Sequence, residues 1–252
     1  MNTDTILILG GTADSRELAK NLIGSGRKLI YSVAGLVRQP NLDCEVHSGG
    51  FSNGEVDGAE GLAAFAIEKG VCLIIDATHP YAAEISANAV AAAEMTNIQC
   101  WRLDRSGWDP NHYPLWHDYE DLESLIPLLQ TFSRPFLSVG ISALKVAHLR
   151  PDHQTWVVRS ARPFADQSGI VQINAIGPFT LQEELKLMEN NRIDVLVAKN
   201  SGCSGVEAKM KAARKLELPV YVQRRPNLAP ATRSFGTVRD MVDAIETVSQ
   251  AR

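Results

Sequence analysis

One short segment holds the densest set of residues that could do chemistry. It reads Asp76-Ala77-Thr78-His79-Pro80-Tyr81-Ala82 and directly follows an apolar run. A carboxylate, a hydroxyl, an imidazole and a phenol in one turn can bind a polar ligand, and His79 or Tyr81 could supply a proton as a general acid. A purely structural alternative stays open, in which Asp76 and Thr78 cap the next helix and His79 is an ordinary turn residue.

A second candidate site follows the first apolar run, residues 5–9. It reads Gly10-Gly11-Thr12-Ala13-Asp14-Ser15-Arg16. Glycines let a phosphate approach the backbone, and the start of the next helix attracts an anion. Thr12, Ser15 and Arg16 would add two hydroxyl donors and a cation. The segment lacks the G-x-G-x-x-G pattern, so an ordinary tight turn is the alternative.

The residues after the second apolar run bear on which nucleotide would bind. Dinucleotide folds that select NAD usually place an acidic side chain here, which pairs with the ribose 2′-hydroxyl. No acidic residue occurs between Ser32 and Asn41, whereas Ser32 and Arg38 could hold a 2′-phosphate. This pattern favours NADP, with a simply exposed Arg38 as the alternative.

A third candidate site lies in the C-terminal half. An apolar run ending at Ala198 continues into Lys199-Asn200-Ser201-Gly202-Cys203-Ser204-Gly205 and a helix. A lysine, small polar residues and a helix start can bind a carboxylate or a phosphate. Lys209 lies one turn further along, and Arg225 follows the next strand. Scattered surface charge is the structural alternative.

Charge is divided unevenly along the chain. Residues 1–133 carry 8 Lys/Arg and 18 Asp/Glu, a net charge of −10, whereas residues 134–252 carry 17 and 11, a net charge of +6. A modestly basic half suits an acidic small molecule. Without basic runs or interleaved aromatic residues, nucleic acid is the weaker interpretation.

Composition excludes several other classes. The chain has 252 residues, of which 45% are apolar and 21% charged, as in globular proteins. No apolar run is long enough to span a membrane. The first ten residues lack a cationic start and lead straight into a strand, so we do not expect a signal peptide. The four cysteines form no C-x-x-C pair, so we expect reduced thiols in a cytoplasmic protein. The histidine spacings make a metal site improbable.

Apolar runs and helical patterns that could position these sites alternate along the chain. We expect strands at 5–9, 28–33, 43–48, 71–76, 98–103, 136–139, 155–160, 193–198 and 219–222. We expect helices at 14–24, 59–68, 82–95, 119–131, 180–188, 205–217 and 238–250, with capping boxes at Asp14/Glu17, Thr180/Glu183 and Ser204/Glu207. Residues 104–118 predict a loop.

This alternation predicts an α/β fold with parallel sheets and right-handed crossovers. We expect two doubly wound Rossmann-like lobes with a cleft between them. Residues 1–133 would form the dinucleotide-binding lobe and residues 134–252 the substrate-binding lobe, with the joint near Ser133-Arg134-Pro135.

Taken together, the motifs resemble one enzyme family. Leu9-Gly10-Gly11-Thr12, Ile75-Asp76-Ala77-Thr78-His79-Pro80-Tyr81-Ala82, Gly177-Pro178-Phe179-Thr180, Lys199-Asn200-Ser201-Gly202 and Arg225-Pro226 occur in this order. In this respect the chain resembles the precorrin-6A reductases of cobalamin biosynthesis, including those of the cobalt-first branch. The resemblance covers nearly the whole chain, and the Asp-Ala-Thr-His-Pro-Tyr block is its most specific part.

The resemblance implies a reaction and roles for the candidate residues. A nicotinamide cofactor would give a hydride to the precorrin-6A macrocycle, a tetrapyrrole rich in carboxylates. The residues Ser32 and Arg38 favour NADPH over NADH as that cofactor, although the sequence alone does not settle the choice. The pyrophosphate would be bound by Gly10, Gly11, Thr12, Ser15 and Arg16, and the 2′-phosphate by Ser32 and Arg38. The nicotinamide side would be lined by Asp76, Thr78 and His79. The substrate carboxylates would be bound by Lys199, Ser201, Gly202, Lys209 and Arg225. Tyr81 and His79 are the candidate proton donors.

Two other functions stay open at this stage. A non-catalytic NADP-binding sensor would explain the first lobe equally well, although it leaves the second anion site unused. A reductase of another small acidic substrate would share the fold, because fold alone does not fix the substrate. The sequence does not indicate an oligomeric state.

Overall fold

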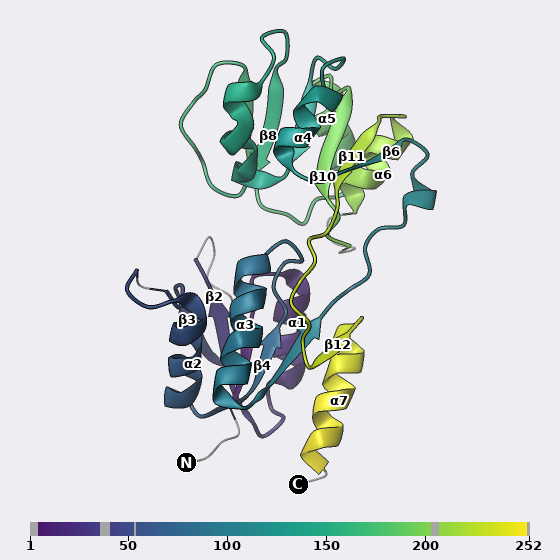
Figure 1. The fold of residues 1–252 in the computed structure, drawn as a ribbon. Coiled ribbons are helices and arrows are strands. Elements are labelled where there is room, and N and C mark those ends of the chain that lie inside the picture. The colour runs from purple at the N-terminus through teal and green to yellow at the C-terminus, as the bar shows by residue number, and fades with distance from the viewer. Residues whose placement is uncertain (1–4, 36–40, 53, 203–206, 251–252) are drawn as a thin grey trace. The chain divides into compact units, whose positions relative to one another are not determined.

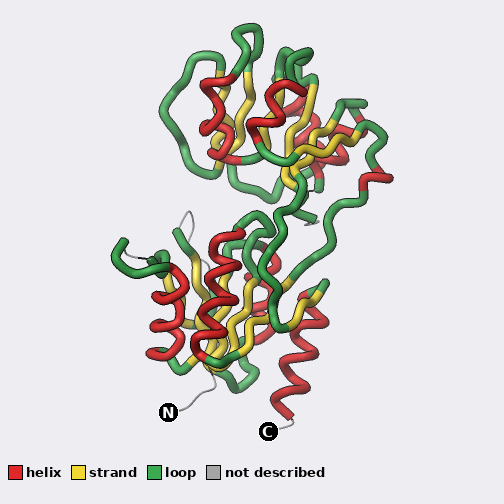
Figure 2. The backbone as a smooth tube through the Cα atoms, in the orientation of Figure 1, coloured by secondary structure: helices red, strands yellow, loops and turns green. Residues whose placement is uncertain are grey.

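The computed structural model describes residues 5–35, 41–52, 54–202 and 207–250, and for 248–250 the backbone only. The chain forms two compact units, Met1–Ser106 with Pro226–Arg252, and Gly107–Arg225. Each unit is a parallel six-stranded sheet with helices on both faces (Figures 1 and 2), as the alternating pattern predicted.

The sheet of the first unit has the strand order β12-β5-β4-β1-β2-β3, and every pair is parallel. Its strands are β1 (Thr5–Leu9), β2 (Lys28–Val33), β3 (Glu45–Ser48), β4 (Val71–Asp76), β5 (Gln99–Leu103) and β12 (Arg233–Phe235). Its helices are α1 (Ala13–Leu22), α2 (Gly58–Glu68), α3 (Ala83–Thr96) and α7 (Val238–Gln250).

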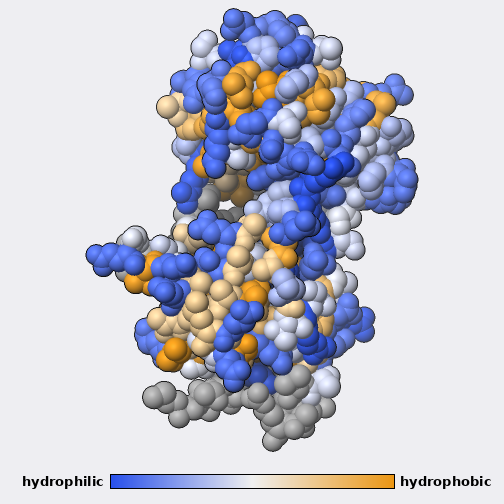
Figure 3. Space-filling model, viewed as in Figure 1, coloured by the Kyte–Doolittle hydropathy of each residue, from blue (hydrophilic) through white to orange (hydrophobic). Residues whose placement is uncertain are grey.

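Alternation along β1 explains why both faces of this sheet are covered. Ile6 and Ile8 pack with apolar residues of α1 and α7 on one face. Leu7 and Leu9 pack with α2 and α3 on the other face. All five residues of β1 are buried, as expected for a central parallel strand. Figure 3 shows an apolar strip over the α2–α3 layer. Two large apolar side chains of these helices, Ile67 of α2 and Met95 of α3, are exposed.

The second unit repeats this architecture with the strand order β6-β11-β10-β7-β8-β9. Its strands are β6 (Trp116–Tyr119), β7 (Pro135–Ser138), β8 (Trp156–Ser160), β9 (Ile170–Asn174), β10 (Val195–Lys199) and β11 (Val220–Gln223). Helices α5 (Leu181–Asn190) and α6 (Ala208–Lys215) cover one face. Helix α4 (Leu122–Leu128) and the 3₁₀ segment η2 (Gly140–Leu149) cover the other, and a short 3₁₀ turn, η1 (Pro110–His112), precedes β6.

The two units divide the chain differently from the boundary expected at residue 133. Strand β6 lies before that boundary but pairs with β11 of the second unit. Strand β12 and helix α7 lie at the end of the chain but belong to the first unit, where β12 pairs with β5. Because each edge strand finds its partner far away in sequence, local pattern does not indicate which sheet it joins.

Three short strands and the two 3₁₀ segments, η1 and η2, were not predicted. Strands β6, β9 and β12 have three to five residues each, and they are edge strands that carry polar or exposed side chains. Segment η2 follows Val139 as a 3₁₀ helix. The strand predicted at 43–48 and the helix predicted at 119–131 are present but shorter.

Two of the three predicted capping boxes can be compared with the helix caps in the structure. The capping box at Thr180 and Glu183 is confirmed, because each side chain bonds the backbone amide of the other residue. The box expected at Asp14 and Glu17 was wrong. Helix α1 is capped instead by Thr12, whose hydroxyl accepts from Ser15 N while the Ser15 hydroxyl accepts from Thr12 N. The box expected at Ser204 begins outside the described residues.

Candidate active site

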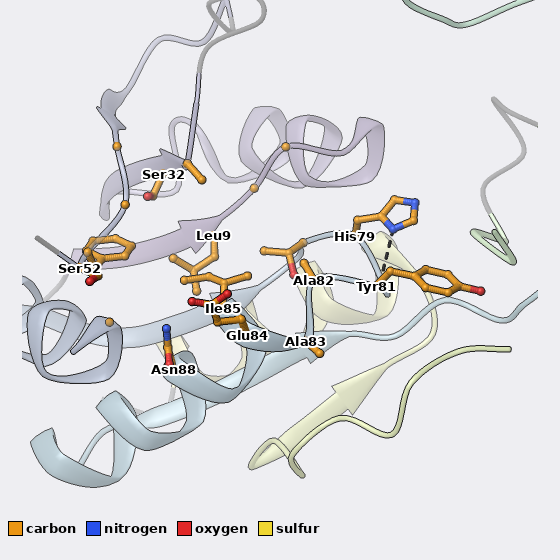
Figure 4. Close-up of a pocket in the computed structure, with 18 residues that line it drawn as sticks. Leu9, Ser32, Ser52, His79, Tyr81, Ala82, Ala83, Glu84, Ile85 and Asn88 are labelled. Atoms are coloured by element: carbon orange, nitrogen blue, oxygen red, sulfur yellow. Dashed lines mark hydrogen bonds between the residues drawn. The ribbon is translucent and has the colours of Figure 1, made fainter. Parts of the chain in front are cut away.

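A pocket of about 490 Å³ lies at the carboxyl edge of the first sheet (Figure 4). It extends over the ends of β1, β2 and β4, which is where the strand order changes direction and where ligands bind in open α/β sheets. Six predicted site residues line it: Gly10, Gly11, Ser32, Thr78, His79 and Tyr81. The structure therefore brings together segments that are far apart in the sequence.

Both glycines of the first loop are required by its geometry. A Cβ atom at Gly10 would lie 2.3 Å from the ring of Tyr31, which packs beneath the loop. Gly11 has a φ of +110°, a conformation that side chains disfavour. The loop can therefore turn tightly between β1 and α1 and expose backbone to the pocket.

The loop residues Thr12, Ser15 and Arg16 have other surroundings than the sequence suggested. Ser15 is fully buried, and its hydroxyl bonds the carbonyl of Thr12 and the hydroxyl of Tyr31. The Thr12 hydroxyl donates to the carbonyl of Ala77, at a distance of 3.0 Å. Thr12 thus ties the glycine loop to the Asp76–Ala82 turn, and Ser15 stabilises the loop from within. Arg16 is exposed on α1 and does not line the pocket.

Asp76 lies beneath the second turn and does not line the main pocket. Its Oδ2 atom pairs with Arg102 Nε at 2.9 Å, and both side chains are almost completely buried. Its Oδ1 atom accepts from the Thr78 hydroxyl at 2.7 Å and from Thr78 N at 3.2 Å. Asp76 therefore fixes the shape of the turn, and Thr78 is the member of this pair that lines the pocket.

His79 and Tyr81 lie together at one end of the pocket, whereas Ser32 and Ser52 lie at the other (Figure 4). The Nδ1 atom of His79 accepts a weak hydrogen bond of 3.4 Å from Tyr81 N. In the neutral ring this bond favours a proton on Nε2. Both side chains are half-buried, as a proton donor at the mouth of a pocket would be.

Ser32 ends up where the sequence predicted, at the carboxyl end of β2 and in the pocket wall. Its carbonyl accepts from Gly10 N at 2.8 Å, which joins the ends of β1 and β2. Arg38, the other residue expected to hold a 2′-phosphate, lies outside the described residues.

Sequence reasoning missed one wall of the pocket. Gly49, Gly50, Phe51 and Ser52 follow β3 and line it together with residues of α2 and α3, including Asn88. The Gly-Gly pair directly after a short strand was the available signal, because it repeats the arrangement at Gly10 and Gly11. The five glycines that line the pocket leave backbone surface that an extended dinucleotide can contact closely, so the residues present fit such a cofactor.

In the second unit, the turn after β10 gathers other predicted residues. Arg225 Nε donates to the carbonyl of Asn200 at 2.9 Å, and Ser201 N donates to the carbonyl of Lys199. These residues lie at the carboxyl ends of β10 and β11, and Gly202 continues the turn with a φ of +67°. Lys199, Ser201, Gly202 and Arg225 therefore share one edge of the second sheet.

Lys209 joins this group from helix α6. Its side chain is buried, with Nζ 5.4 Å from the ring centre of Trp108. Trp108 N donates in turn to the side-chain oxygen of Asn200 at 2.7 Å. Asn200 thus connects the loop before β6 with the turn after β10. Arg224, by contrast, points to exposed acidic partners, Asp118 and Glu120.

Burial lowers the pKa of Lys199, and the nearby charge of Lys145 lowers it further. Lys145 belongs to η2, so the second unit places another cation near the turn that sequence reasoning did not include. Two lysines that disfavour each other's charge form a favourable site for a carboxylate, because an anion offsets their repulsion.

Two negative findings concern the described part of the chain. No group of three or more potential metal-ligating side chains occurs among the residues that the structure describes. No described helix has both the length and the apolar character needed to cross a bilayer.

Comparison with known proteins gives matches over almost the entire chain. Residues 5–246 match the model of the family described as Precorrin-6x reductase CbiJ/CobK. A Rhodococcus erythropolis protein named Precorrin-6A reductase is 40% identical, with 96% of each chain covered. A Priestia megaterium protein named Cobalt-precorrin-6A reductase is 29% identical, with 98% of this chain and 99% of that protein covered. A solved structure titled CobK precorrin-6A reductase superposes with a TM-score of 0.88 at 33% identity and covers 96% of each chain.

Proposed function

The chain belongs to the precorrin-6x reductase family, and from that membership we propose that it reduces precorrin-6A to precorrin-6B in cobalamin biosynthesis. The observation that carries this proposal is the family match over residues 5–246, together with full-length identity of 40% to a relative of that name. The glycine-lined pocket and the basic turn after β10 fit the two ligands that such a reaction requires.

We propose NADPH as the cofactor, and it would supply the hydride when bound. The glycine-lined pocket of the first unit would hold it, with Gly10, Gly11 and Thr78 in contact and Ser32 on the ribose side. The absence of an acidic residue between Ser32 and Asn41 supports the phosphorylated form, since NAD selection relies on a carboxylate there. Arg38 is the cation proposed for the 2′-phosphate.

Reduction of one C=C or C=N bond adds a hydride and a proton, so the chain or solvent must deliver the proton. We propose His79 as the donor, because its ring lines the pocket at the same end as Tyr81. It would act in its doubly protonated form, in which Nδ1 no longer accepts the weak 3.4 Å bond from Tyr81 N. Tyr81 lies beside it, with ring centres 5.6 Å apart, and is the second candidate. The ion pair of Asp76 and Arg102 holds the turn that carries both rings.

The substrate carboxylates would bind the basic turn of the second unit. Lys199, Lys209 and Arg225 supply the charges, and Ser201 and Gly202 shape the turn between them. A nucleotide sensor would not need this second anion site, which supports an enzyme over the non-catalytic alternative.

We propose the metal-free macrocycle as the natural substrate. Identity of 40% to the relative named for precorrin-6A, against 29% to the one named for its cobalt form, supports this choice. We also propose a cytoplasmic location, supported by the free thiols of the described cysteines Cys44, Cys72 and Cys100.

The test is NADPH oxidation by the purified protein, followed at the nicotinamide absorbance. Precorrin-6A and its cobalt form are supplied in parallel, and NADH is run as the alternative reductant. We expect substrate-dependent oxidation, fastest with NADPH and the metal-free macrocycle. Tight NADPH binding without turnover of either macrocycle would contradict the reductase and favour a sensor.

A further inference from the structure

Tyr31, on strand β2, lies under the glycine loop and was not among the predicted site residues. Its side chain is 1% exposed, it does not line the pocket, and it packs with the residues between the sheet and α1. Its hydroxyl accepts from Gly11 N at 2.9 Å and bonds the Ser15 hydroxyl at 2.7 Å. Its ring also fills the space where a side chain at Gly10 would lie.

These contacts change how the loop can bind a phosphate. Four amides of the segment already donate to protein oxygens: Gly10 to Ser32, Gly11 to Tyr31, Thr12 to Ser15, and Ser15 to Thr12. In a phosphate-binding glycine loop such amides point at the ligand. Here the Gly11 amide points instead to a phenol that lies on the protein side of the loop.

We infer that Tyr31 is a positioning residue for the cofactor, which holds the glycine loop in its binding shape by engaging the Gly11 amide. The pyrophosphate then contacts the loop through the surface of Gly10 and Gly11 and the positive end of α1, and not through the Gly11 N–H. Because this role presupposes that the pocket takes a dinucleotide, it rests on the proposed function.

The phenol does three things that no other residue at this position would combine. It accepts the hydrogen bond of the Gly11 amide, it bonds the buried Ser15 hydroxyl, and its ring fills the space beside Gly10. Phenylalanine keeps the ring but loses both hydrogen bonds, so Tyr31→Phe separates the polar role from the packing role. Without its acceptor, the Gly11 peptide can rotate, and binding must then order the loop.

The experiment measures the Kd of NADPH by direct titration, and kcat and KM by turnover, for the wild type and Tyr31→Phe. We expect the Kd and the KM of NADPH to rise about 3- to 10-fold, the range that the loss of one or two buried hydrogen bonds gives. The kcat and the KM of the tetrapyrrole should not change. Amide hydrogen exchange at Gly11 should become faster in the free protein.

Tyr113→Phe is the matched control. Tyr113 is a buried tyrosine of the second unit, 4% exposed, whose hydroxyl donates to Glu207 Oε1 at 3.1 Å. Its loss should lower the melting temperature without changing the Kd of NADPH, so a general loss of stability is distinguishable. If Tyr31→Phe does not fold, Ser15→Ala removes one of the two bonds of the phenol, together with the bonds of the Ser15 hydroxyl to Thr12, and it should raise the Kd as well.

An unchanged or lower Kd in Tyr31→Phe, with wild-type binding intact, would overturn the role of Tyr31 and leave the proposed function standing. A lower Kd in particular would mean that the released Gly11 amide binds the phosphate better than the phenol-bound loop does. Failure of the wild type to bind either nicotinamide cofactor would instead overturn the proposed function and this role together.

Discussion

Oδ2 of Asp76 lies 2.9 Å from Nε of Arg102, in an ion pair that is almost completely removed from solvent. Asp76 is the last residue of β4, and Arg102 is its register partner near the end of the neighbouring strand β5. Arg102 also donates from Nη1 to the carbonyl of Ala229 at 2.6 Å, in the segment that returns to the first unit. The pair thus joins the Thr78–Tyr81 turn to a part of the chain more than a hundred residues away.

Breaking this pair should destabilise the protein strongly. Asp76→Asn keeps an oxygen for Thr78 but leaves the Arg102 charge buried without its counter-ion, which typically costs about 3–5 kcal/mol. We expect a fall of that size in the free energy of unfolding, measured by urea denaturation. Combining it with Arg102→Met should restore part of the loss. A change below about 1 kcal/mol would show that the charge is solvated there.

A methyl group at Gly10 should disrupt the cofactor pocket. Gly10→Ala would place Cβ 2.3 Å from the Tyr31 ring, so the loop or the ring must move. We expect a loss of about 1–3 kcal/mol in stability and a large increase in the Kd of NADPH, measured by titration. Gly236→Ala is the matched control, because no atom lies within 4 Å of its Cβ position. Normal NADPH affinity in Gly10→Ala would contradict the tight packing of the loop on Tyr31.

Measuring kcat of two variants distinguishes His79 from Tyr81 as the proton donor. Loss of a general acid typically lowers the rate by about 10²–10⁴-fold, so we expect His79→Gln to lower kcat by at least about 10²-fold with little change in the Kd of NADPH. Tyr81→Phe should keep kcat within a few-fold of the wild type. The opposite result, a large loss in Tyr81→Phe alone, would assign the proton to the phenol.

The lowered pKa of Lys199 predicts a dependence on pH. Only the charged ammonium attracts a carboxylate, and a lysine with a lowered pKa loses its charge at a lower pH than an ordinary lysine. The KM of the tetrapyrrole should therefore rise on the alkaline side as the pH approaches this pKa. In Lys199→Arg the rise should move to higher pH, because the guanidinium stays protonated. Superimposable pH profiles of KM for the two proteins would exclude Lys199 from substrate binding.

Much of the fold could be predicted because its signals are local. Residues 5–9, 28–33 and 71–76 form strands with the predicted bounds, since buried parallel strands appear as short apolar runs. The Thr180 capping box needs only four consecutive residues. The edge strands β6, β9 and β12 escaped prediction because a short, half-exposed strand has no distinctive pattern, and β6 and β12 are also held by partners distant in sequence.

The types of residues in the candidate sites were also readable from the sequence, because each follows a strand at the edge where ligands bind. Pocket residues Gly10, Gly11, Ser32, Thr78, His79 and Tyr81 were located in this way. Their individual roles depend on long-range contacts. The sequence contains a serine at position 15 and an aspartate at position 76, but only the tertiary structure buries both of them beside Tyr31 and Arg102, respectively.

The sequence by itself determined the α/β class, most central strands and the family resemblance, because apolar periodicity and short motifs act over a few neighbouring residues. The tertiary structure decided which sheet each edge strand joins and which polar side chains line the pocket. Those outcomes depend on pairs such as Tyr31 with Gly11 and β12 with β5, in which residues distant in the chain satisfy each other's hydrogen bonds. No local sequence pattern predicts such a pair, because the hydrogen bonds of each partner are satisfied only when the fold brings the other partner beside it.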